Sequence, residues 1–265
     1  MPGIPLVSIP DPARSAWIAL RDELLAILGD DLVAAWAFGG TTSVDDPAHP
    51  GDLDTYVLLA EPPDVATARR LEAVETTIAS ERGVEWDSWY VLAGDARRTD
   101  PPRHAWRDGR RDTAWALNRA QFLAGRYVGL HGPDPTAVVS APSRDELDTD
   151  LSRELEHIER HVLEGDTDPY EATYALLNGS RILHSVETGD PAISKRAAGT
   201  WGLEHLPDRW HPTLRAALRN YVGEATTEDV AFLAAEMAPF VAFVRERLPL
   251  AEGRAADDPP RWSGS

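Results

Sequence analysis

The sequence has no cysteine, a single lysine and no long hydrophobic segment. Without cysteine, the chain can form neither disulfide bonds nor thiolate metal sites. No apolar run is long enough to span a bilayer, and the first residues lack a basic region followed by an apolar one, so we expect a soluble, cytoplasmic protein with no membrane partner. The lysine is Lys195, among 26 basic residues in all. Either genome composition favours arginine, or this one position requires an ammonium group.

Positive charge is scarce throughout the chain. The formal net charge is -18 and the isoelectric point is about 4.8. An acidic surface repels nucleic acid and attracts small cations, so we expect no nucleic-acid partner, although acidity also simply favours solubility. The 265 residues are enough for one large domain or two modest ones.

Two predicted strands carry the most informative pattern. Residues 32–38 and 53–60 are both apolar and short. Asp52 and Asp54 lie at the start of the second strand, and alternation places both carboxylates on the same face. Such a pair is repulsive unless a cation lies between the two, and Mg²⁺ is the ion that combines one or two protein carboxylates with water and substrate phosphates. The simpler alternative is a solvated strand edge.

A glycine turn follows the first of these strands. Gly39 and Gly40 allow the backbone to approach phosphate groups closely, and Thr41 adds a hydroxyl. A third strand is predicted over 84–92, with Glu85 and Asp87 on one face. We therefore expect a third carboxylate near the metal pair, either Asp87, which we prefer, or Glu85, unless both are exposed acids of an edge strand.

The remaining segments predict helices separated by loops. In the first part of the chain we expect helices over 11–28, 64–82 and 112–131, with an irregular loop over 93–111. Pro142 and Ser143 mark a domain boundary. Beyond it every predicted element is a helix, with Pro239 expected to kink or divide the last; the predicted ranges are 147–163, 170–188, 194–203, 212–221 and 227–248. Residues 251–265 are expected to form a flexible tail.

The strand, glycine pair, hydroxyl residue and Asp-Leu-Asp of residues 33–59 resemble the nucleotidyltransferase superfamily with the DNA polymerase beta type of palm. The resemblance implies an α+β fold, with a mixed sheet and helices in domain 1–142 and an all-α bundle in domain 143–250. It also implies that Gly39, Gly40 and Thr41 contact nucleotide. Asp52 and Asp54 would bind Mg²⁺, with two ions expected. The acid on the third predicted strand, Asp87 or Glu85, would be catalytic.

The segment Leu177-Asn178-Gly179-Ser180-Arg181, with Ser194-Lys195-Arg196 after it, is similar to the carboxy-terminal domain of the aminoglycoside adenylyltransferases that modify streptomycin and spectinomycin. In that family, an arginine and a lysine at the positions of Arg181 and Lys195 reach the phosphates of ATP. An acidic residue at the position of Glu171 binds the amino groups of the drug.

The same resemblance bears on the choice of drug. Members that accept streptomycin carry a tryptophan and an aspartate in the loop before the helix of Glu171. Residues 162–168 contain no tryptophan here, which favours spectinomycin or another aminocyclitol. Trp106 is a candidate for the aromatic wall that the family places in an earlier loop, with a core tryptophan as the alternative.

Three functions are consistent with these patterns. The first is a monomeric, ATP- and Mg²⁺-dependent adenylyltransferase that acts on an aminoglycoside or aminocyclitol and releases pyrophosphate. The second is a nucleotidyltransferase that acts on a protein, a tRNA end or a metabolite. The third is a catalytically silent binder of nucleotide or ligand. Turnover of ATP with a panel of drugs tests the first function, and calorimetric binding of Mg²⁺-ATP with no turnover of any substrate would favour the third.

Overall fold

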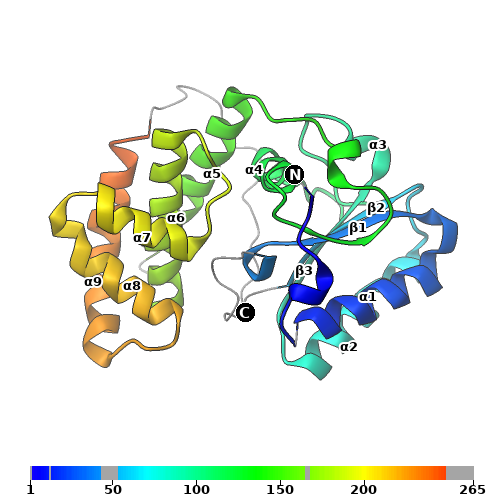
Figure 1. The fold of residues 1–265 in the computed structure, drawn as a ribbon, viewed down its shortest axis with the longest axis horizontal. Coiled ribbons are helices and arrows are strands. Elements are labelled where there is room, and N and C mark those ends of the chain that lie inside the picture. Colours follow the sequence, from blue (N-terminus) through cyan, green and yellow to red (C-terminus); the bar gives the residue numbers. More distant parts are fainter. Residues whose placement is uncertain (1, 12, 43–52, 165–167, 249–265) are drawn as a thin grey trace. The chain divides into compact units, whose positions relative to one another are not determined.

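The computed structural model describes residues 2–11, 13–42, 53–164 and 168–248. The chain divides into two compact units, residues 1–142 and 143–265 (Figure 1). The first combines a mixed sheet with helices, and the described part of the second consists of helices and loops. The predicted α+β class is therefore confirmed. The tail predicted over 251–265 lies outside the described residues.

The sheet of the first unit has four strands in the order β3-β2-β1-β4. β1 pairs antiparallel with both β2 and β4, whereas β2 and β3 run parallel. A parallel pair needs a crossover connection, and the helix between β2 and β3 supplies it. The strands are β1 (Leu32–Phe38), β2 (Leu53–Leu59), β3 (Trp86–Leu92) and β4 (Val128–His131).

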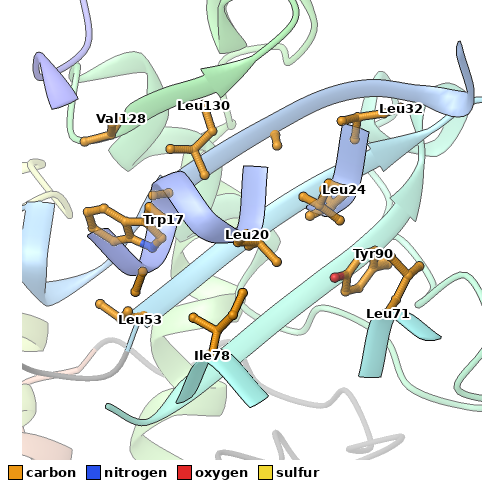
Figure 2. Packing of buried hydrophobic residues seen from close by; sticks show 14 of the residues in the cluster. Trp17, Leu20, Leu24, Leu32, Leu53, Leu71, Ile78, Tyr90, Val128 and Leu130 are labelled. Carbon is orange, nitrogen blue, oxygen red and sulfur yellow. The ribbon is translucent and has the colours of Figure 1, made fainter. Parts of the chain in front are cut away.

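One face of the sheet is covered by α1 (Ala13–Leu28) and α2 (Val65–Arg82). Trp17, Leu20 and Leu24 recur at helical spacing on α1 and are fully buried against the strands (Figure 2). α2 begins as predicted, because the Asp64 carboxylate accepts a hydrogen bond from the Thr67 amide at 2.7 Å. These contacts fix the strands that carry the predicted acids.

The opposite face is aromatic and is covered by α3 (Ala93–Ala96) and α4 (Trp115–Leu123). The Tyr56 ring stacks on Trp115, with centroids 5.3 Å apart, and meets Phe122 edge-on at 5.8 Å. Rings at such distances contribute about 0.5–1.5 kcal/mol each beyond their burial. This face is therefore rigid close to the ends of β1, β2 and β3.

The prediction of one helix over 112–131 was wrong. α4 ends at Leu123, and Gly125 adopts a positive φ of 78° that a right-handed helix does not allow. The chain then forms β4, whose four residues pair with β1 and so join a sheet edge. A strand this short depends on pairing with a partner distant in sequence, which local periodicity does not reveal.

The second unit is built from five α-helices within the described residues (Figure 1). Capping boxes start two of them, at Ser143 and at Thr226. Among the described residues, no helix combines the length and apolar character that a membrane crossing requires. The helices are α5 (Arg144–Leu163), α6 (Pro169–Thr188), α7 (Lys195–His205), α8 (His211–Tyr221) and α9 (Thr227–Arg245).

The last helix continues through Pro239 and is not divided there. Proline removes one backbone hydrogen bond, but Phe240 and Val241 are buried beside it. Phe240 packs so closely on α6 that a Cβ on Gly179 would lie 2.9 Å from its ring. Burial of this apolar face offsets the lost hydrogen bond.

Candidate active site

Two predicted acids lie side by side in the sheet. Asp54 of β2 is the register partner of Asp87 of β3, and Phe38 of β1 is its partner on the other side. Neighbouring residues of a parallel pair point to the same face, and both acids share the face of Tyr56 and Trp89. The structure therefore brings Asp54 and Asp87 together at one end of the sheet. Asp52, the other predicted metal ligand, lies outside the described residues.

The glycine turn packs directly against Asp54. Gly39 has a φ of 83°, and a Cβ at this position would overlap the Asp54 carboxylate and lie 2.8 Å from its Cγ. Both the backbone conformation and the close approach therefore require glycine. Gly40 differs, since a Cβ there would meet open space.

The turn is completed by a hydroxyl residue that we did not single out from the sequence. Thr42 is buried, and its Oγ1 donates a hydrogen bond to the carbonyl oxygen of Gly39 at 2.8 Å. It ends the short 3-10 turn Gly40–Thr42 that leads away from β1. Thr41, the predicted hydroxyl, lies in that turn, but its side chain lies outside the described part of the structure.

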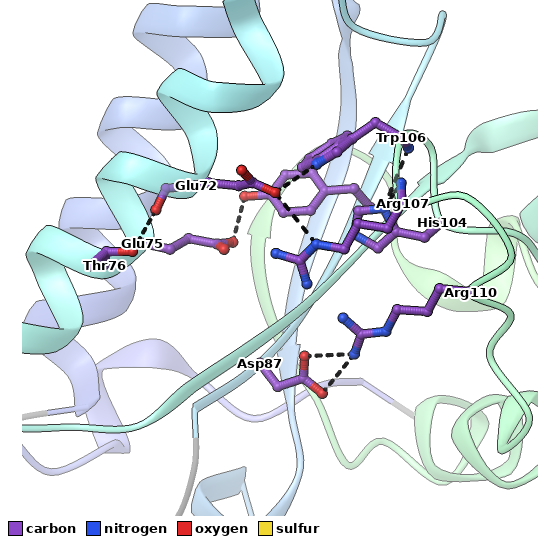
Figure 3. A network of polar contacts seen from close by, with 9 residues as sticks. Glu72, Glu75, Thr76, Asp87, His104, Trp106, Arg107 and Arg110 are labelled. Carbon is purple, nitrogen blue, oxygen red and sulfur yellow. Dashed lines mark hydrogen bonds and ion pairs between the residues drawn. The ribbon is translucent and has the colours of Figure 1, made fainter. Parts of the chain in front are cut away.

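Asp87 is paired with an arginine that sequence patterns did not reveal. Arg110 Nη2 donates to Asp87 Oδ1 at 2.9 Å and to Oδ2 at 3.3 Å (Figure 3). Its guanidinium also lies 4.3 Å from the centroid of the Trp89 ring. Both side chains of the pair are largely buried, at 17% and 20% exposure. The ion pair and the stacked ring hold the irregular segment after α3 against β3.

Glu85, the alternative to Asp87, lies just before β3 and is exposed. Its carbonyl oxygen accepts a hydrogen bond from the Leu53 amide at 2.9 Å. The backbone of Glu85 thus helps to set the register in which Asp54 meets Asp87, while its side chain lies two residues before Asp87 along the chain.

The buried acid Asp112 holds residues that flank the site. Asp112 accepts hydrogen bonds from the Tyr56 hydroxyl and from Asn118 Nδ2, both at 2.9 Å. Burial raises the pKa of Asp112, and the charge of Asp87 raises it further, while the hydrogen bonds lower it. Burial raises the pKa of Tyr56 as well, so its hydroxyl remains a donor. Asp112 and Arg110 together attach the same segment to β2 and β3.

Trp106 lies on the other face of the sheet (Figure 3). Its ring centroid is 4.5 Å from that of Tyr90, and its Nε1 donates to Glu72 Oε1 at 3.1 Å. Tyr90 belongs to the core beneath α1 and α2, whereas Asp87 points to the aromatic face. The structure therefore does not bring Trp106 to the carboxylate pair.

The predicted cations of the second unit lie near each other. Arg181 donates from Nε to the Ile193 carbonyl at 3.0 Å and from Nη1 to Asn178 Oδ1 at 2.9 Å. Lys195 is the first residue of α7, and its Nζ lies 4.7 Å from the centroid of the Tyr174 ring. The charges of both cations act on Glu154, whose pKa they lower against the larger effect of burial.

Glu171 lies on α6 ten residues before Arg181. A helix rises about 1.5 Å per residue, so the two side chains are separated by about 15 Å along the axis. His161 Nδ1 of α5 lies 3.8 Å from Glu171 Oε2, and the His157 and His161 rings are 4.7 Å apart. Burial lowers the pKa of His157 to about 4, so this ring is neutral near pH 7. Glu171 and Arg181 thus lie at well-separated positions along one helix.

The donor set at the sheet end fits a hard divalent cation. Asp54 and Asp87 offer carboxylate oxygens side by side, and Mg²⁺ needs only one or two protein carboxylates when phosphates supply the rest. Over the described ranges, no group of three or more histidine, aspartate or glutamate side chains could hold a metal by itself.

Comparison with known proteins identifies the second unit. Residues 143–247 match the family model "Aminoglycoside adenylyltransferase, C-terminal domain". No curated protein sequence matches the chain. Among solved structures, the chain is similar to spectinomycin adenyltransferase AAD(9) from Enterococcus faecialis, crystallised with ATP and spectinomycin; the TM-score is 0.66 at 17% identity, over 86% of this chain and 99% of that one. Residues 143–247 are therefore similar to the C-terminal domain of the aminoglycoside adenylyltransferases, and the chain shares the fold of a solved spectinomycin adenyltransferase.

Proposed function

We propose that the protein transfers AMP from ATP to a hydroxyl group of an aminocyclitol of the spectinomycin type and releases pyrophosphate. The match of residues 143–247 to the aminoglycoside adenylyltransferase C-terminal domain supports adenylyl transfer to a drug of this class. The observation that carries the proposal in this chain is the pairing of Asp54 with Asp87 beside a turn that only glycine fits.

The carboxylates supply the metal site in this proposal. Asp54, together with Asp52, would hold Mg²⁺, with a second ion shared with ATP. When bound, the metal neutralises the phosphates and polarises the α-phosphate toward attack. Gly39 has no side chain and so leaves room for the Asp54 carboxylate beside the turn, and Gly40 leaves the turn open for a phosphate to approach.

Asp87 is the residue to which we assign activation of the substrate hydroxyl, with Glu85 as the alternative. A carboxylate beside the metal pair accepts the proton that the attacking hydroxyl loses. Asp87 is preferred because it is the register partner of Asp54, whereas Glu85 is exposed and precedes the strand.

The cations of the second unit would bind the triphosphate. Lys195 begins α7, where the helix macrodipole disfavours a cation and favours an anion. The charges of its ammonium group and of the Arg181 guanidinium both lower the pKa of Glu154, so the two cations lie close to the same carboxylate. A triphosphate offers the charge that two such cations require.

Glu171 is assigned to an amino group of the drug. A partly exposed carboxylate suits a cationic ligand, and the net charge of -18 raises the rate at which such a ligand encounters the protein. Trp106 is not part of the proposed binding wall, because it packs on Tyr90. Streptomycin is disfavoured since residues 162–168 lack the tryptophan of family members that accept it; residues 165–167 lie outside the described structure.

The test is pyrophosphate release from Mg²⁺-ATP with a panel of spectinomycin, streptomycin and related drugs. We expect release with spectinomycin and far less with streptomycin. Release with none of the drugs would remove the drug-modifying function. Binding of Mg²⁺-ATP without turnover of any substrate would point to a silent binder instead.

A further inference from the structure

Lys195 occupies an electrostatically unfavourable place. Ser194 caps α7, accepting a hydrogen bond from the Ala197 amide at 3.1 Å, and Lys195 is the next residue. The positive end of a helix macrodipole repels a cation by about 0.3–1 kcal/mol. A flexible ammonium group at this position needs other contacts to keep it in one place.

The ring of Tyr174 provides such a contact. It lies on α6, and its centroid is 4.7 Å from Lys195 Nζ. An ammonium group within about 6 Å of an aromatic face is attracted to it by about 0.5–2 kcal/mol, depending on desolvation. Tyr174 is partly buried, so its position is set by the packing of α6.

The Tyr174 ring is in turn fixed by an acid. Its hydroxyl donates a hydrogen bond to Glu154 Oε1 of α5 at 2.8 Å. Burial raises the pKa of Glu154, and the Tyr174 hydrogen bond and the charges of Arg181 and Lys195 lower it. The acid therefore holds the phenol and attracts the cations, including the ammonium that lies against the same ring.

Arg181 is held differently. Its Nε and Nη1 are bound to the Ile193 carbonyl and to Asn178, so hydrogen bonds orient its guanidinium plane. A lysine has no such plane, and its orientation depends more on the surfaces around its stem. Hydrogen bonds thus orient Arg181, whereas the ring of Tyr174 lies beside Lys195, and the charge of Glu154 acts on both cations.

We propose that Tyr174, with its hydroxyl held by Glu154, is a positioning residue that places the Lys195 ammonium group for the triphosphate. The proposal rests on the phosphate role assigned to Lys195 above and adds the residues through which that role is achieved. Tyr174 acts through the lysine and need not touch the nucleotide.

The single lysine makes the contact directly measurable. Reductive methylation of the full chain with ¹³C-formaldehyde labels Lys195 and otherwise only the terminal amine. Ring current from Tyr174 should shift the Lys195 methyl signal upfield, and Tyr174→Phe should keep that shift because the ring remains. Tyr174→Leu should abolish it, while the control Phe232→Leu, exposed on α9, should leave it unchanged. An unchanged signal in Tyr174→Leu would overturn the proposal.

The effect of Tyr174 on nucleotide binding is tested by a double-mutant cycle, with ATP affinity measured by calorimetry. Tyr174→Leu should weaken ATP binding about tenfold, within the range of cation-π energies. In the Lys195→Gln background it should cause no further loss, because the group it positions is gone. Glu154→Gln, which keeps an acceptor for the hydroxyl, should weaken binding less than Tyr174→Leu.

The outcomes separate the two claims. If Lys195→Gln leaves ATP affinity intact, the phosphate role itself is wrong, and the positioning role is wrong with it. If Lys195→Gln weakens ATP binding and Tyr174→Leu does not, only the positioning role fails. If Tyr174→Leu is equally damaging with and without Lys195, Tyr174 acts by another route, and circular dichroism then shows whether that route is loss of folding.

Discussion

The sheet unit and the helical unit arrange their charged groups in different ways. In the sheet, Asp54 and Asp87 are far apart in sequence and meet because β2 and β3 pair in one register. In the helical unit, Glu171 and Arg181 are ten residues apart on one helix, which separates them by about 15 Å along its axis. The first arrangement places two carboxylates on neighbouring strands, which suits a metal. The second places opposite charges at separate positions along one helix, which suits a ligand that is itself charged at both ends.

The sharpest test of the sheet arrangement is Gly39→Ala. The methyl group would overlap the Asp54 carboxylate and force a residue with a side chain into a φ of 83°. Displacing a reacting group by about 1 Å can reduce turnover about 100-fold. Gly40→Ala is the matched control, since its Cβ would meet open space. Equal turnover of the two variants would show that the turn does not hold Asp54 in place.

The helical arrangement predicts a loss of binding rather than of chemistry. Lys195→Gln removes the ammonium group and should weaken ATP binding about 10- to 100-fold, the value of a charge-assisted hydrogen bond to phosphate. Arg196→Gln, at the next and exposed position, is the control. Calorimetric titration with Mg²⁺-ATP measures both. A similar loss in the control variant would mean that net charge, and not the placement of Lys195, governs affinity.

Acid sensitivity should appear in both units, through one buried histidine in each. Burial lowers the pKa of His104 to about 3 and of His157 to about 4, from an ordinary value of 6.5. Below about pH 6.5 the unfolded chain binds protons that the folded chain does not, so stability falls as pH drops toward these lower values. Each histidine contributes a slope of up to about 1.4 kcal/mol per pH unit.

Urea unfolding near pH 7 and near pH 5 measures this slope. His157→Gln should reduce it in the helical unit and His104→Gln in the sheet unit. An unchanged slope in both variants would show that other groups cause the acid sensitivity.

The smallest expected effect concerns the ion pair of Arg110 with Asp87. Arg110→Gln should destabilise the sheet unit by about 1 kcal/mol, because the pair is largely buried and the guanidinium also stacks on Trp89. Arg103→Gln, exposed in the same segment, should change little. Thermal unfolding of both variants provides the comparison. If Arg103→Gln destabilises as much as Arg110→Gln, the pair with Asp87 is not what holds the segment.

Local signals in the sequence predicted much of this fold. The bounds of β1 and of α2 follow from an apolar run and from the Asp64 cap, and both are local properties. β4 was missed because its four residues become a strand only by pairing with β1. A helix was therefore predicted across residues that include Gly125, where the backbone turns.

The candidate site also has features that local sequence signals predicted and features that depend on contacts between distant residues. Strand alternation placed Asp54 and the third acid on defined faces, but only the structure brings Asp54 beside Asp87. Arg110 meets Asp87 across 23 residues of chain, and no periodicity encodes that contact. Trp106 was singled out by its residue type and packs elsewhere because Tyr90 and Glu72 offer it contacts on the opposite face. The assignments of Asp87, Lys195 and Glu171 remain predictions for experiment.

The most direct test of the account is adenylylation of spectinomycin by the full chain with Mg²⁺-ATP, followed by mass spectrometry, in the wild type, Asp54→Asn and the exposed control Asp30→Asn. The account predicts adenylylated drug with the wild type and with Asp30→Asn, and none with a folded Asp54→Asn. Product formation by Asp54→Asn at the wild-type rate would contradict the claim that this carboxylate carries the metal-dependent chemistry.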